Sequence, residues 1–198
     1  MTGIIAAGYL GIGAPDLDKG RRYGSEVLGL AVREMDDGAL TMRMDERAWR
    51  FRIEHGERGL KFLGLEVVDD ESLTRLVDRL KNAGVGVSEE PELAELRGVN
   101  GVVTVLDPDG NRIEIFHGAK QSKDRFMSPT GASFIADRLG FGHVVLVFLR
   151  FAEAQYFYRD LLGFKLSDTI GKTMFLHVNG RHHSLAIAPE TAERKSGL

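Results

Sequence analysis

The sequence has 198 residues, of which 43% are hydrophobic and 28% charged, with a formal net charge of −3. This length can bury a core in one large domain or in one and a half small ones. There is no cysteine, which excludes disulfides, cysteine-based zinc sites and a thiol nucleophile. Charges of both signs are mixed without a basic run, so neither nucleic acid nor a membrane surface is an expected partner. No apolar run is as long as a bilayer span and no signal-peptide pattern opens the chain, so a cytoplasmic protein is expected.

The first unit, residues 4–53, has a strand–helix–strand–strand–strand (βαβββ) pattern. Residues 4–12 predict a strand. Asp16 can then cap a helix over 17–28. Three shorter strands, separated by turn-forming residues, are expected at 31–35, 39–44 and 48–53.

The second unit, residues 60–117, repeats this pattern with a clearer helix. A strand over 60–68 is followed by a helix that begins near Asp69 and ends at Gly84. Its apolar residues have helical spacing and form one stripe: Leu73, Leu76, Val77 and Leu80. Three strands are expected after it, at 85–88, 101–106 and 112–117. The last two are joined by the strong turn sequence Asp107-Pro108-Asp109-Gly110-Asn111.

A polar connector, residues 119–139, leads to the third unit, residues 142–188. Here a strand over 142–149 precedes a helical stripe over 154–161. Three strands are expected after it, at 164–169, 173–178 and 183–188.

The first and third units align without a gap at a constant offset of 134 residues. Tyr9 aligns with His143, and Arg47 with Arg181. An internal duplication is therefore expected. The fold class that follows is α+β, built from repeated βαβββ modules. Because the duplication implies four modules, we expect that three of four are present before the chain ends at Leu198.

Two short apolar stretches of the third unit carry histidines. His143 opens one and the His182-His183 pair opens the other. A histidine in such a stretch is most often a core or surface residue rather than a ligand. Because side chains alternate along a strand, His182 and His183 are expected to point to opposite faces. We interpret His182 and His177 as surface or inter-strand hydrogen-bonding residues.

Five motifs distributed over nearly the whole chain belong together: Gly8-Tyr9-Leu10-Gly11, the hairpin from Asp107 to Phe116, Gly140-Phe141-Gly142-His143, the stretch from Phe157 to Phe164, and Asn179-Gly180-Arg181-His182-His183. On these motifs the sequence resembles the two-domain extradiol ring-cleavage dioxygenases of the vicinal oxygen chelate superfamily. The resemblance implies cleavage of a biaryl or polycyclic catechol by O₂. It also implies a non-haem Fe(II), or alternatively Mn(II), held by two histidines and one glutamate.

The resemblance also assigns roles to particular residues. His143 corresponds to the first metal ligand, and His183 to the histidine that takes a proton from the catechol. Phe175 corresponds to a position that lines the substrate pocket. The other two metal ligands belong to the fourth module, so the chain as given is expected to be inactive and can lack a bound metal.

The implied domains are a non-catalytic pair of modules over 1–118, the connector over 119–139, and the first half of a catalytic domain over 140–198. In the non-catalytic domain Glu114 lies at the glutamate-ligand position. Its companion positions hold Tyr9 and Phe62, so a vestigial or solvated carboxylate and a metal-free cavity are expected. Trp49, the only tryptophan, aligns with His183 and is expected to pack in this half.

Two further expectations concern partners and the alternative function. The apolar sheet face of the third unit predicts a homo-oligomer. A non-enzymatic member of the superfamily that binds a small aromatic molecule is the alternative to a dioxygenase, whose partners are a catechol and O₂. Metal content separates the two, because the binding protein needs none.

Overall fold

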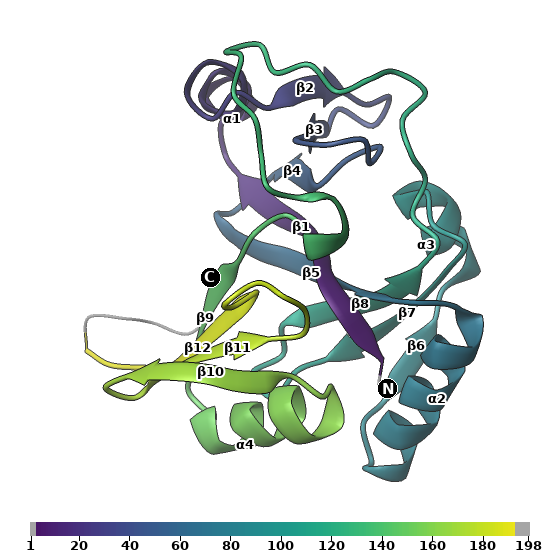
Figure 1. The fold of residues 1–198 in the computed structure, drawn as a ribbon, viewed down its shortest axis with the longest axis vertical. Helices are drawn as coiled ribbons and strands as arrows, with labels where there is room; N and C mark the ends of the chain where they lie inside the picture. Colours follow the sequence, from purple (N-terminus) through teal and green to yellow (C-terminus); the bar gives the residue numbers. More distant parts are fainter. Residues whose placement is uncertain (1–2, 193–198) are drawn as a thin grey trace.

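The computed structural model describes residues 3–192 and shows an α+β protein with one large and one small β-sheet (Figure 1). The predicted fold class is therefore confirmed. The chain follows the order of the three predicted units. The connector passes over the first unit and returns to the centre of the molecule before the third unit begins.

The first unit has these elements: β1 Ile4–Ala14, α1 Leu17–Arg22, the π-helical segment η1 Tyr23–Val27, β2 Ala31–Glu34, β3 Leu40–Arg43 and β4 Phe51–His55. The predicted helix is thus divided, because its second half widens into a π-helix. Asp16 caps α1 by accepting a hydrogen bond from the Lys19 N–H at 2.9 Å. β4 begins three residues later than predicted, since residues 45–50 form a turn held by side-chain hydrogen bonds.

The second unit has these elements: β5 Gly59–Val67, α2 Asp70–Asn82, β6 Val87–Glu89, α3 Pro91–Arg97, β7 Gly101–Leu106 and β8 Arg112–His117. Asp69 caps α2, which buries its predicted apolar stripe. The seven-residue helix α3 was not predicted. Pro91 opens it, and Gly98 ends it with a left-handed φ of 66°.

The third unit follows the 3₁₀ turn η2 Asp137–Leu139 at the end of the connector and has these elements: β9 Val144–Phe148, α4 Phe151–Gln155, the π-helical segment η3 Tyr156–Leu161, β10 Lys165–Ile170, β11 Thr173–His177 and β12 Leu185–Pro189. Both the first and the last predicted strands are shorter than expected. As a result His143 and His183 lie just outside β9 and β12.

The duplication extends to the hydrogen-bonding register. The parallel partners Leu10 and Phe51 of β1 and β4 correspond, at the same offset of 134, to Val144 and Leu185 of β9 and β12. Strand order also matches, being β2-β3-β4-β1 in the first unit and β10-β11-β12-β9 in the third. The π-helical segments fall at equivalent positions. The two units are therefore the same structure with different side chains.

The first two units form one continuous sheet, because β1 and β5 pair antiparallel along most of their length. The third unit forms its own sheet and attaches to the second through side chains. The Tyr158 hydroxyl donates to the Asp107 carboxylate at 2.9 Å, and Arg79 donates to the Leu161 carbonyl at 2.9 Å. The Asp109 carboxylate accepts from the backbone N–H groups of Leu149 and Arg150. The turn Asp107–Asn111 thus fixes the position of α4.

Candidate active site

The three residues to which the resemblance gives roles lie together in the third unit. His143 directly precedes β9 and His183 shortly precedes its parallel neighbour β12. Their ring centroids are 4.5 Å apart. Phe175 of β11 presents its ring to His183 in an edge-on arrangement with a centroid distance of 5.0 Å. His143 is exposed and the other two side chains are half-buried, so the cluster is open to solvent.

His183 belongs to a segment that we call the His loop, residues 178–184, between β11 and β12. The Nδ1 atoms of His182 and His183 are 3.0 Å apart, within hydrogen-bonding distance. The expectation that these two side chains point to opposite faces is wrong, because β12 starts only at Leu185 and strand alternation does not reach them. His182 is exposed, and His177 contacts the Ser167 hydroxyl, in agreement with the roles predicted for them.

The pKa of His183 is lowered below its usual value. Burial, which disfavours the imidazolium, is the largest cause, and positive charge at His143, His182 and Arg181 adds to it. Since an unperturbed imidazole titrates at about pH 6.5, His183 is neutral at pH 7. A neutral imidazole is the form that accepts a proton.

An iron site of the implied type needs three side-chain ligands. Within residues 3–192, no group of three or more His, Cys, Asp or Glu side chains is arranged to hold a metal ion. His143 offers one imidazole, a donor that suits iron. The Nδ1 of its neighbour His183 already faces His182. The described residues therefore supply one candidate ligand and do not complete a three-ligand site.

Glu114, which the resemblance assigns to the glutamate-ligand position of the N-terminal half, is fully buried. Its carboxylate accepts hydrogen bonds from the Tyr9 hydroxyl at 2.8 Å and from two guanidinium nitrogens of Arg97, each at 2.8 Å. Arg112 adds a third partner at 3.1 Å. The solvated carboxylate considered for Glu114 is therefore wrong. Burial and the adjacent Glu114 charge raise the pKa of Tyr9 well above its usual value, so its phenol stays protonated.

Aromatic rings fill the space around this ion pair. Tyr9 lies 4.6 Å from Trp49 and 4.4 Å from Phe116 between ring centroids. The guanidinium of Arg97 lies 3.8 Å from the centre of the Phe62 ring. The packing predicted for Trp49 is observed, and the space around Tyr9 and Glu114, where a cavity was expected, is occupied by side chains.

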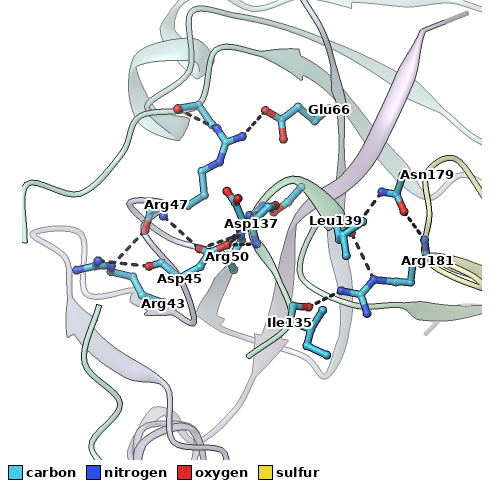
Figure 2. A network of polar contacts seen from close by, with 12 residues as sticks. Arg43, Asp45, Arg47, Arg50, Glu66, Ile135, Asp137, Leu139, Asn179 and Arg181 are labelled. Carbon is cyan, nitrogen blue, oxygen red and sulfur yellow. Dashed lines mark hydrogen bonds and ion pairs between the residues drawn. The ribbon is translucent and has the colours of Figure 1, made fainter. Parts of the chain in front are cut away.

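Sequence reasoning did not single out two residues that hold the His loop, Asn179 and Arg181 (Figure 2). The side-chain N–H of Asn179 donates to the Ile5 carbonyl of β1 at 2.8 Å. The Arg181 guanidinium donates to the carbonyls of Leu139 and Ile135 at the end of the connector. The His loop is therefore bonded to parts of the chain far from it in sequence.

The alignment of the two units did contain a signal for this pair. Asn179 and Arg181 align with Asp45 and Arg47 at the offset of 134. The Asn179 side-chain oxygen accepts from the Arg181 N–H at 3.0 Å, as the Asp45 carboxylate accepts from the Arg47 N–H at 3.1 Å. The same side-chain-capped turn occurs in both units.

Comparison with known proteins agrees with this geometry. Residues 7–56 match the family model Dihydroxybiphenyl dioxygenase BphC D1. Residues 140–198 match the Glyoxalase/Bleomycin resistance protein/Dioxygenase superfamily. A crystal structure described as BphC, a halotolerant catechol dioxygenase, superposes with a TM-score of 0.90 at 34% identity, covering 94% of this chain and 65% of that one.

Characterised relatives narrow the assignment. The chain is 38% identical to biphenyl-2,3-diol 1,2-dioxygenase of Paraburkholderia xenovorans (strain LB400), over 93% of this chain and 66% of the relative. It is also 38% identical to 3-methylcatechol 2,3-dioxygenase of Pseudomonas putida F1, over 93% and 68%. An iron-dependent extradiol dioxygenase of Rhodococcus jostii (strain RHA1) is 37% identical over 94% and 68%. The chain belongs to the extradiol dioxygenase family of this superfamily. It spans about two thirds of the length of these relatives. Among residues 3–192, no helix has the length and hydropathy to cross a membrane.

Proposed function

We propose that the protein acts in the extradiol ring cleavage of a biaryl or polycyclic catechol by O₂. Of the relatives at 38% identity, one is named for dioxygenation of biphenyl-2,3-diol, which supports a biaryl substrate, and another for dioxygenation of 3-methylcatechol. The observation that carries the proposal is the contact between His143 and His183, whose rings meet at 4.5 Å beside Phe175. The cluster unites a candidate metal ligand, a candidate proton acceptor and an aromatic surface.

We assign His143 as a ligand of non-haem Fe(II); one relative is named as iron-dependent. Iron with open coordination positions supplies a place where a catechol and O₂ bind side by side. The described residues provide only this one ligand. His183 and Phe175 have roles toward the catechol itself.

We assign His183 as the base that takes a proton from a catechol hydroxyl. Its lowered pKa keeps the ring neutral at pH 7. In the tautomer whose Nδ1–H donates to His182, Nε2 is the atom that takes the proton. Phe175 offers the flat apolar surface against which an aromatic substrate packs.

The test is a reconstitution of the reaction. The chain is loaded with Fe(II) without oxygen, mixed with 2,3-dihydroxybiphenyl and then with air-saturated buffer, and the ring-opened product is followed by its visible absorbance. Because the described residues supply only one iron ligand, the chain as given should form no more than a trace of product. His143→Ala should abolish the product, and His183→Gln should lower its rate about 10²-fold, the usual contribution of a positioned base. His55→Ala, at an exposed histidine of β4, is the matched control.

The alternative is a protein that binds an aromatic molecule without chemistry. It predicts that 2,3-dihydroxybiphenyl binds equally well with and without iron, and that no product forms. Binding unchanged by His143→Ala, with no product in any variant, would favour this alternative.

A further inference from the structure

We infer that Asn179 and Arg181 are positioning residues: they hold the His loop against the connector and β1 so that the His183 ring stays beside His143. The inference rests on the proposed function of His183, and it adds two residues that act through it without touching substrate. It also gives the N-terminal half a role in the site, as the fixed support to which the loop is bonded.

The His loop is closed by one of its own side chains, that of Asn179. The Asn179 side-chain oxygen accepts from the Arg181 N–H, which closes a tight turn directly before His182 and His183. The same side chain donates from its nitrogen to the Ile5 carbonyl at 2.8 Å. One amide therefore sets the turn and ties it to β1. An Asp in place of Asn179 keeps the acceptor and loses the donor.

Arg181 bonds the His loop to the connector. Its Nε lies 3.4 Å from the Leu139 carbonyl, and its Nη2 donates to the Ile135 carbonyl. A guanidinium presents donors in a rigid planar fork, so contacts to two carbonyls restrict both its position and its orientation. Since only one residue separates Arg181 from His183, this restriction passes to the His183 backbone.

The connector is also bonded to the first unit, through Asp45 and Arg50 (Figure 2). The Asp137 N–H donates to the Asp45 carboxylate at 2.9 Å, and Arg50 donates to the Asp137 carbonyl at 2.7 Å. Asp137 has a φ of 54°, a left-handed conformation that is rare for residues other than glycine and that these bonds maintain.

A close backbone approach completes the support. The Phe141 N–H donates to the Ala7 carbonyl of β1 at 3.0 Å. At Gly140, with φ of 79°, a side-chain carbon would lie 2.2 Å from the same carbonyl oxygen. Only glycine permits this contact. Residues 135–141, which are the end of the connector and the two residues after it, are therefore fixed to the first unit on one side and bonded to the His loop on the other.

The structural test uses hydrogen exchange of the His-loop amides and the nuclear Overhauser effect between the His143 and His183 rings. Arg181→Ala should speed exchange of the loop amides about tenfold and weaken the ring-to-ring signal. Arg79→Ala is the matched control, because Arg79 also donates to a carbonyl of the third unit, that of Leu161, but far from the His loop. Should Arg181→Ala fail to fold, Asn179→Asp tests the same anchoring with a nearly isosteric change.

The functional test is the rate of ring cleavage in the reconstituted reaction. Arg181→Ala should lower kcat about 10²-fold with a smaller effect on KM, as expected for a misplaced group. Arg181→Lys, which reaches one carbonyl but not two, should recover part of the rate. Wild-type loop exchange and ring contacts in both Arg181→Ala and Asn179→Asp would overturn the inference. A loosened loop in a protein that binds 2,3-dihydroxybiphenyl equally well with and without iron would support anchoring and overturn the proposed function instead.

Discussion

Glu114 is a charge that has become part of the protein core. A carboxylate removed from water is costly unless ionic and hydrogen-bonding partners replace the solvent. Here Arg97 provides two charge-assisted hydrogen bonds, and Tyr9 and Arg112 provide others. The guanidinium of Arg97 thus supplies the positive charge that balances the buried Glu114 carboxylate.

Replacing Arg97 should be strongly destabilising. Arg97→Met leaves the buried Glu114 without its main ionic partner, and we expect a loss of about 3–5 kcal/mol in the free energy of unfolding. The double variant Arg97→Met/Glu114→Gln removes both charges and should recover much of this loss. Urea denaturation measures both. A similar loss in the exposed variant Arg75→Ala, which should cost about 0.5 kcal/mol or less, would show that charge burial is not the cause.

Asp45 predicts a specific loss of stability in acid. Burial favours its neutral form most strongly, but hydrogen bonds from Arg50, Asp137 and Arg47 together outweigh burial and hold its pKa below the usual value. When folding lowers the pKa of a carboxyl, its ionised form stabilises the folded protein. This contribution is complete at pH values above the pKa of the unfolded state, about 3.9. It is lost as the pH falls through the lower pKa of the folded state. The stability difference between the wild type and Asp45→Asn should therefore be constant near pH 7 and shrink below about pH 4. Urea titrations across this range test it, and a difference independent of pH would contradict it.

At this scale the sequence identified His143 and His183 because their residue types and motifs carry chemical information. It could not identify Asn179 or Arg181 as anchors, because their partners are backbone carbonyls in the connector and β1. A carbonyl is present at every position and leaves no pattern in the sequence. It also could not predict that Arg97 neutralises Glu114, since α3 itself was not anticipated.

Elements of this fold are positioned by contacts from other units. α4 has no side-chain cap of its own, and Asp109 from the turn between β7 and β8 accepts from the N–H groups just before it. A carboxylate at a helix N-terminus is stabilised by the helix dipole as well as by these bonds. The strong turn sequence therefore caps a helix in a different unit.

Asp109→Ala should cost about 1–2 kcal/mol, the usual value for a lost cap, and should loosen the third unit. Hydrogen exchange of α4 and β9 should rise, because the cap also connects the units. Asp69→Ala is the matched control, since Asp69 caps α2 within its own unit. It should cost a similar free energy and leave exchange in α4 unchanged. Equal effects of both variants on α4 would contradict a role of Asp109 in docking.

A helix or strand was predicted well when the residues that determine it lie within its own stretch of sequence. α2 has an N-cap and a four-residue apolar stripe within its own sequence, and it was predicted closely. α3 is short and begins with a proline amid acidic residues, so it resembled a loop. β4 and β12 begin late because the turns at Asp45 and Asn179 compete with strand pairing through side-chain hydrogen bonds. The duplication was visible because it repeats many weak signals at one offset.

At the scale of the whole molecule, the units are joined in two different ways. The first and second share a continuous sheet through β1 and β5, with backbone hydrogen bonds along both strands. The third joins them through side chains and one backbone contact at Ala7. The apolar side chains of the third unit belong to the same buried cluster as those of the other two units, so the third unit should depend on them for its stability.

We therefore predict that residues 1–118 fold on their own and that residues 119–198 do not. The fragment 1–118 retains the whole eight-stranded sheet, and the Arg97–Glu114 ion pair lies within it.

Arg50, which is buried, loses the Asp137 carbonyl in this fragment but keeps Asp45 and the Gly8 carbonyl as partners. The fragment also exposes Phe51, whose ring packs at 5.4 Å from that of Phe141 in the full chain. We therefore expect cooperative unfolding at a lower urea concentration than for the full chain, with dispersed amide resonances. The complementary fragment should show neither, because it loses Asp107, Asp109, Arg79 and Ile5 as partners. Circular dichroism and amide spectra of both fragments test this, and a folded 119–198 fragment or an unfolded 1–118 fragment would show that the dependence between the halves runs the other way.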